Sequence, residues 1–205
     1  MQAFRRIVRR ARLLGVALAA LCLGACASLL PPAPGGAVPQ RSQLESFALE
    51  GRFSLRHEEK SYSGHLTWQH VGDKDELLLA SPFGQGLAEI VSDRAGARLT
   101  ASDGKAYAAS DAETLTQQAL GYPLPLTALL GWVRGRGAAG DATVADGFGR
   151  PLSLQREFWR IDYEYDNDDP QSLPGRLFVR QEGGLELRLR IDEWRDLNHE
   201  KAAQP

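Results

Sequence analysis

Alternation of apolar and polar residues is the feature of this 205-residue sequence that most restricts its fold. Along residues 47–56 the odd positions are apolar or glycine and most even positions are polar. The same period of two returns at 62–69, 159–165 and 185–192. Because successive side chains of a strand point to opposite faces, each segment predicts a strand with one buried and one solvated face. Such strands are typical of antiparallel sheets.

Two helices are predicted between the early and the late strands. Asp111 can cap a helix over 112–120 that ends at Gly121, since aspartate accepts hydrogen bonds from the first helical turn and glycine ends helices. A second predicted helix, over 126–133, is apolar on nearly every side. A helix of this kind must be covered all round or must itself cover an apolar surface.

Weaker strands at 97–101, 106–109 and 176–181 bring the total to about ten to eleven, while the glycine-rich stretch over 134–151 is predicted as a loop. Two short helices cannot cover so many strands of a flat sheet. The pattern therefore predicts a mainly β fold with inserted helices: an incomplete, half-open antiparallel β-barrel with a helical lid over its apolar inside. A flat sheet packed on two helices is the plainer alternative.

A hairpin with an unusual tip is predicted over residues 77–91. Two apolar runs flank Ser81-Pro82-Phe83-Gly84, and Pro/Gly punctuation between β-prone runs is typical of a turn. Turn tips face water and seldom carry a large apolar ring. We therefore expect Phe83 to contact something apolar outside the domain.

The N-terminus has the features of an export signal. Five arginines precede an apolar stretch over 13–23 that is too short to span a bilayer comfortably. The sequence Leu23-Gly24-Ala25-Cys26 is similar to a bacterial lipobox, in which cleavage precedes a lipid-modified cysteine; Ala25-Cys26-Ala27 also fits an ordinary secretory cleavage site. The lipobox interpretation predicts four segments, which are a signal peptide over 1–25, a lipid-anchored Pro/Gly-rich tether over 26–41, a single domain over 42–196 and a polar tail over 197–205.

Charge and cysteine content exclude several function classes. The chain has 24 basic and 26 acidic residues, and residues 1–25 hold five of the basic ones and no acidic one, so the mature chain would carry a net charge of −7. This charge argues against a nucleic-acid binder or a polybasic membrane clamp. Both cysteines lie at or before the cleavage site, which leaves none for a disulfide or a thiol site in the domain.

The sequence contains no pattern typical of a catalytic or metal site. His65 and His70 are five residues apart, so in a strand they point to opposite faces. The acidic residues over 166–169 lack the glycine and distal glutamate of a calcium loop. Ser81 has no nucleophile-elbow glycines, and Gly84-Gln85-Gly86 lacks the third glycine of a dinucleotide site. We expect no enzyme activity, no cofactor and no metal.

The apolar face of the strands can form either a solid core or a ligand cavity. Aromatic and leucine side chains on an inward face most often form core. Two observations favour a cavity. Gly51 and Gly64 occupy inward positions, where they leave space or permit sharp curvature, and the second helix is more apolar than one-sided packing requires.

The motifs, taken in order, resemble the LolB family of outer-membrane lipoprotein receptors. The resemblance runs from about Phe47 to Trp194 and rests on weak motifs in a specific order. These motifs are Gly51-Arg52, Trp68, Ser81-Pro82-Phe83-Gly84, Gly121-Tyr122-Pro123-Leu124-Pro125, Leu130-Gly131-Trp132-Val133-Arg134-Gly135, Trp159 with Tyr163, and the last strand ending at Trp194. The family most often has Leu where this chain has Phe83, and often has Pro where this chain has Gly137.

The resemblance implies a receptor anchored at Cys26 to the periplasmic face of the outer membrane, and Ala27 fits the family's sorting rule for that membrane. It would accept acylated lipoproteins from a soluble, LolA-like periplasmic carrier and insert them into the membrane lipid, as a monomer, without nucleotide. Pro82, Phe83 and Gly84 would form the membrane-insertion loop. The acyl-chain cavity would be lined by Phe47, Leu49, Phe53, Leu66, Trp68, Leu126, Leu129, Leu130, Trp132, Val133, Trp159, Ile161, Tyr163, Leu187 and Leu189. The alternative is a structural or assembly-factor lipoprotein with a solid core that binds only protein.

Overall fold

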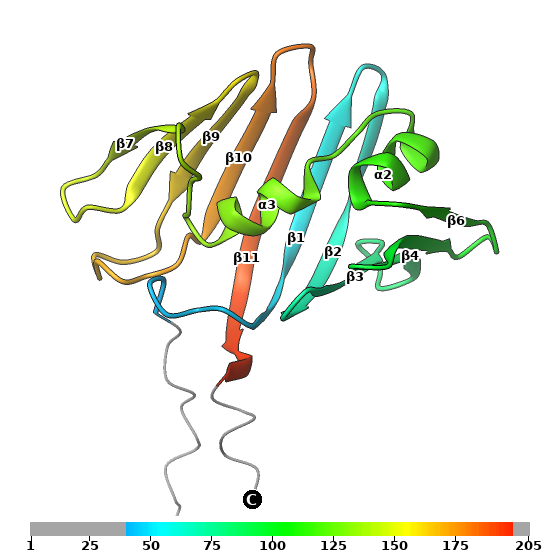
Figure 1. The fold of residues 1–205 in the computed structure, drawn as a ribbon, viewed down its shortest axis with the longest axis horizontal. Helices are drawn as coiled ribbons and strands as arrows, with labels where there is room; N and C mark the ends of the chain where they lie inside the picture. The colour runs from blue at the N-terminus through cyan, green and yellow to red at the C-terminus, as the bar shows by residue number, and fades with distance from the viewer. Residues whose placement is uncertain (1–39, 199–205) are drawn as a thin grey trace, which may run out of the picture. The chain divides into compact units, whose positions relative to one another are not determined.

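The computed structural model describes residues 40–198, and these form one antiparallel sheet of eleven strands with two helices on one face (Figure 1). The predicted signal peptide, Cys26 and nearly all of the predicted tether lie outside the described residues, as does the tail from 199. The elements are β1 (Phe47–His57), β2 (Lys60–Val71), β3 (Lys74–Ala80), β4 (Gly86–Asp93), β5 (Gly96–Ala101), β6 (Ala106–Ala109), α2 (Ala112–Leu120), α3 (Leu126–Val133), β7 (Ala142–Ala145), β8 (Pro151–Arg156), β9 (Trp159–Glu164), β10 (Arg176–Gln181) and β11 (Glu186–Asp196).

The strand order places the two ends of the domain at the centre of the sheet. The order is β6-β5-β4-β3-β2-β1-β11-β10-β9-β8-β7, so each half is a run of hairpins and the first strand pairs with the last. The edge strands β6 and β7 do not pair with each other. An antiparallel sheet that curves without closing confirms the predicted half-open barrel.

Gly51 and Gly64 account for part of the curvature. A Cβ atom on Gly51 would lie 2.2 Å from the carbonyl oxygen of Arg190 in β11, and one on Gly64 would lie 1.9 Å from that of Ala80 in β3. Only glycine allows the neighbouring backbone to approach so closely. Of the two roles considered for these glycines, the structure supports sharp curvature; the space beside them is filled by backbone.

The helices begin and end at the residues that the sequence indicates. The Asp111 carboxylate accepts a hydrogen bond from Thr114 N at 2.7 Å, which caps α2, and Gly121 ends it in the left-handed conformation at φ 94°. Helix α3 buries Leu126, Leu129, Trp132 and Val133 against the sheet. Both helices lie over the apolar face of the sheet: α2 packs against β5 and β6, and Figure 1 shows α3 in front of β10 and β11.

Strand β7 corrects the predicted loop over 134–151. Its four residues, Ala-Thr-Val-Ala, are all exposed, and they pair with β8 at the edge of the sheet. A strand that buries neither face carries no apolar–polar alternation, so periodicity could not reveal it. The remainder of the stretch is irregular, as predicted.

Candidate functional site

The residues predicted to line the acyl-chain cavity come together on the inner side of the sheet and on the helices that cover it. Twelve of the fifteen are buried and three are partly buried, and all belong to one apolar cluster. The partly buried residues are Phe53, Leu130 and Trp159. Cross-strand pairs build the cluster: Leu49 faces Trp68 on β2 and Trp194 on β11, and Leu177 links Tyr163 to Leu189.

Two of these fifteen residues carry a buried polar atom that has no hydrogen-bond partner among residues 40–198. These atoms are the indole nitrogen of Trp132 on α3 and the hydroxyl of Tyr163 on β9. Burial raises the pKa of Tyr163 far above its ordinary value and keeps the hydroxyl protonated. The Asp141–Arg156 ion pair lies beside the indole ring, with the guanidinium 5.7 Å from the Trp132 ring centroid. The fifteen residues thus form an apolar set with two unpaired hydrogen-bond donors.

The helical cover is fastened to the β1–β2 hairpin by few contacts. Lys60 Nζ donates to the carbonyl oxygen of Leu120 at 3.2 Å, and the His57 ring lies 4.4 Å from that of Tyr122. The Tyr122 hydroxyl is buried without a partner in the described chain, and burial raises its pKa to about 12. This attachment therefore buries a polar group without a hydrogen-bond partner, which is unfavourable.

The loop at Ser81–Gln85 places Phe83 in solvent. The Phe83 side chain is 93 % exposed, the highest value among the large apolar residues described. Ser81 organises the loop: its N–H donates to Gln85 O at 2.7 Å, and its carbonyl oxygen accepts from Gly84 N at 2.9 Å. The Ser81 hydroxyl accepts from Phe83 N at 3.3 Å and from Gln85 N at 3.2 Å.

This hydrogen bonding satisfies every backbone N–H of the tip. Pro82 has no N–H, and the other four donors from Ser81 to Gln85 are used within the loop. Gly84 takes φ +82°, a conformation that glycine adopts without strain. The tip consequently presents an apolar ring in solvent and a backbone with no unpaired N–H donor.

A shallow groove lies at the base of the same loop. Its volume is about 500 Å³, and strands β2 to β5 form its floor. Leu78 and Leu87 line it and are 52 % and 38 % exposed. Sequence reasoning identified Phe83 but neither of these leucines nor the role of Ser81.

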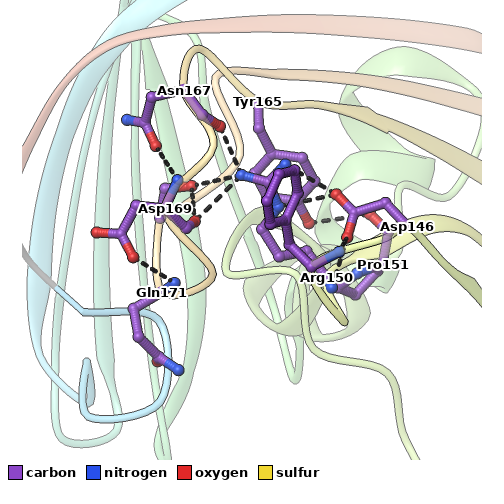
Figure 2. Close-up of polar contacts among 9 residues, drawn as sticks. Asp146, Arg150, Pro151, Tyr165, Asn167, Asp169 and Gln171 are labelled. Atoms are coloured by element: carbon purple, nitrogen blue, oxygen red, sulfur yellow. Dashed lines mark hydrogen bonds and ion pairs between the residues drawn. The ribbon is translucent and has the colours of Figure 1, made fainter.

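A second turn with a phenylalanine lies at the opposite edge of the sheet and is tied to its surroundings by Arg150 (Figure 2). Arg150 is 4 % exposed and donates from Nε to Asp146 Oδ2 at 2.8 Å. Its Nη1 donates to the carbonyl oxygens of Asn167 and Asp169 at 2.6 and 3.1 Å. The guanidinium also stacks on the rings of Phe148 and Tyr165, at 4.9 and 4.1 Å.

Within residues 40–198 no group of histidine, cysteine and acidic side chains could hold a metal ion. His70 is buried and its Nδ1 lies 2.9 Å from Asp75 Oδ1, which also accepts from the Trp68 indole at 2.8 Å. His65 is exposed on the other face, as its spacing from His70 predicts. The His70–Asp75–Trp68 contacts brace β2 against β3 beside Phe47, which is a structural task.

The fold and the site define a class: a half-open antiparallel barrel with helices over its apolar face and an apolar loop tip in solvent. Comparison with known proteins agrees with this class. Residues 45–194 match the family model described as outer membrane lipoprotein LolB. The outer-membrane lipoprotein LolB of Dechloromonas aromatica is 38 % identical over 85 % of this chain and 92 % of its own length. That of Thiobacillus denitrificans is 40 % identical over 89 % of this chain and 97 % of its own.

The chain therefore belongs to the LolB family, and it is an outer-membrane lipoprotein. None of the helices within residues 40–198 is long and apolar enough to cross a membrane. Among solved structures, a LolA superfamily protein from Nitrosomonas europaea matches 75 % of this chain and 86 % of its own, with a TM-score of 0.46 and 13 % identity. Membership of the LolB family supports a role in localising lipoproteins to the outer membrane.

Proposed function

We propose that this protein is a receptor that accepts lipoproteins from a soluble periplasmic carrier and inserts them into the outer membrane. Their acyl chains would bind between the inner face of the sheet and helices α2 and α3. The Phe83 loop would meet the bilayer, and anchoring through Cys26 would keep the domain beside it. The protein would act by binding alone, as a monomer, with no catalysis and no cofactor.

The observation that carries this proposal is the pairing of an apolar interior with an apolar loop tip. Burial of an acyl chain is worth about 0.8 kcal/mol per CH₂, so a chain of roughly 16 carbons costs on the order of 12 kcal/mol to expose to water. Acyl chains must therefore pass directly from one apolar site to the next. The interior offers such a site, and Phe83 offers contact with the final one.

The state of the loop backbone supports entry into lipid. An unsatisfied N–H costs several kcal/mol in the hydrocarbon layer, where no water can replace the lost hydrogen bond. The loop enters with its N–H groups already bonded, mainly to Ser81. Its residues, Ser-Pro-Phe-Gly-Gln, carry no charge that would resist transfer.

The helical cover supports uptake of acyl chains. Entry requires α2 and α3 to move away from the sheet, and Lys60, His57 and Tyr122 are what fasten the α2 end to the β1–β2 hairpin. Opening would expose the Tyr122 hydroxyl to water and relieve its missing hydrogen bond. The acyl chains would replace the apolar contacts that the helices give up.

The test is a transfer assay with the non-lipidated mature chain, Cys26→Ala. After the chain is mixed with a carrier loaded with a lipoprotein, native mass spectrometry should detect the lipoprotein on the chain, and later addition of vesicles should remove it. An assembly factor with a solid core would retain no acylated cargo, and that result would refute the proposal. In cells, depletion of the protein should leave lipoproteins on the carrier.

A further inference from the structure

Two exposed leucines beside the Phe83 loop have no role in the proposed function. Leu78 is half exposed in the middle of β3, on the face opposite to the apolar interior. Its cross-strand neighbours are Thr67 and Glu89, and both of these face outward because the residues flanking them, such as Leu66 and Ile90, face inward. An exposed leucine at this position lowers solubility and contributes nothing to the core.

Leu87 owes its position to an irregularity in the sheet. The β3–β4 register shifts between Leu79 and Ala80, so that Leu79 pairs with Ala88, Ala80 pairs with Gly86, and Leu87 has no partner of its own. A bulge of this kind re-aims a side chain. Here it leaves Leu87 on the wall of the groove, two residues beyond the end of the Phe83 loop.

The groove has the dimensions and lining of a site for an aliphatic chain. It is open to solvent and has a volume of about 500 Å³, and its lining residues on the outer face are His65, Thr67, Leu78, Leu87, Glu89 and Thr100. Gly84 and Gly86 of the loop form its near end, so it is continuous with the tip that carries Phe83. The single charged residue among the groove's lining residues is Glu89.

Polarity on this outer face rises with distance from the tip. The row of cross-strand partners through Leu78 contains Thr67, Glu89 and Thr100. The following row contains Gln69, Glu76, Val91 and Arg98. A surface that changes from an apolar tip through leucines to charged residues matches the passage from acyl chains to headgroups in a bilayer.

We propose that this groove binds one acyl chain of a phospholipid of the outer membrane when the Phe83 loop enters the bilayer. The inference rests on the proposed function, because it requires the loop to reach lipid. A membrane phospholipid is the occupant, rather than the cargo, because Leu78, Leu87 and Glu89 line the groove from the outer face of the sheet, whereas cargo chains would be held on the inner face. A phospholipid chain bound there would hold the domain at a fixed depth and orientation while cargo leaves the interior.

The test compares two leucine-to-threonine changes. Leu78→Thr with Leu87→Thr keeps residues that favour strands and removes the apolar lining. Leu152→Thr is the matched control, since Leu152 is 49 % exposed on β8, near the opposite edge of the sheet. All variants carry Cys26→Ala, and their binding to phosphatidylethanolamine–phosphatidylglycerol vesicles is measured by co-sedimentation.

The double variant should bind vesicles about tenfold more weakly than the parent chain, which corresponds to about 1.4 kcal/mol. The control should bind as the parent does, and all three should unfold at the same urea concentration. Equal binding of the double variant and the parent would overturn the groove proposal and leave the loop proposal standing. Failure of the parent chain itself to bind vesicles would instead refute the function of the loop.

A spin label then locates the occupant. Without Cys26 the mature chain has no cysteine, so Leu78→Cys and Leu152→Cys each accept a single label. On vesicles, the label at 78 should become accessible to oxygen and protected from a water-soluble nickel complex, whereas the label at 152 should not change. If the label at 78 responds to addition of a lipoprotein in the absence of vesicles, cargo occupies the groove and the assignment to phospholipid is wrong.

Discussion

The two turns that carry a phenylalanine, at Phe83 and at Phe148, are built in opposite ways. Phe148 stacks against Arg150, and Arg150 is bonded in turn to the segment over 167–172. Phe83 contacts solvent, and the hydrogen bonds of its loop run between Ser81 and the residues up to Gln85. One turn is part of the framework of the domain, and the other is a self-contained unit attached to it. A self-contained loop suits a surface that must pass from water into lipid, because such a loop can move into the bilayer without disturbing the rest of the fold.

Replacement of Phe83 by Glu should give the largest effect. Because the ring is almost fully exposed, Phe83→Glu should leave unfolding by urea unchanged. A carboxylate at the tip opposes entry into hydrocarbon by about 3 kcal/mol, so insertion of lipoproteins into vesicles should fall about a hundredfold. Phe83→Leu, which keeps a large apolar side chain at the tip, should retain insertion. Loss of folded protein in the Glu variant would mean that Phe83 belongs to the core.

The matching change in the turn that carries Phe148 is Arg150→Ala. It leaves Asp146 and two carbonyl groups without their partner in a buried place, which should lower the free energy of unfolding by about 3 kcal/mol in urea titrations. Insertion measured per folded molecule should not change. Arg176→Ala, which removes an exposed ion pair with Glu164, is the control and should cost below about 1 kcal/mol.

Removal of the Ser81 hydroxyl should weaken entry of the loop into lipid while leaving the free energy of unfolding nearly unchanged. In water, Ser81→Ala lets solvent bond the N–H groups of Phe83 and Gln85, so the free energy of unfolding should change by less than about 1 kcal/mol. In the bilayer no replacement exists, and vesicle binding should fall about tenfold. Ser81→Thr should restore it. Equal vesicle binding of the Ala and Thr variants would show that the loop stays outside the hydrocarbon.

Low pH should destabilise the edge of the sheet at β7 and β8 and leave the Phe83 loop unchanged. The hydrogen bond from Arg156 lowers the pKa of Asp141 below its ordinary value, so this carboxylate stabilises the fold above the unfolded pKa of about 3.9, and the contribution is lost as the pH falls through the folded pKa. Urea midpoints of the parent should drop between pH 5 and about pH 3 more than those of Asp141→Asn. The loop over 81–85 has no titratable side chain to respond.

Local signals in the sequence predicted most elements because they act over a few residues. The cap at Asp111 and the glycine at position 121 mark the two ends of α2, and the alternation of apolar and polar residues predicts the long strands. Leu78 could have been recognised too: three successive leucines in a strand must place the middle one on the opposite face. The role of Arg150 could not, because apart from Asp146 its hydrogen-bond partners lie 17–22 residues away in a different loop. The curvature at Gly51 likewise depends on a carbonyl group from the far end of the chain.

The pairing of β1 with β11 has a consequence for the order of events during export. A chain that leaves the inner membrane N-terminus first releases β1 long before β11, while each flanking run of hairpins can form as it emerges. The centre of the sheet, where Phe47 pairs with Asp196, can only be completed last. Until then the apolar faces of β1 and of its neighbours stay open to solvent, so the central strands are the last part of the sheet to be protected.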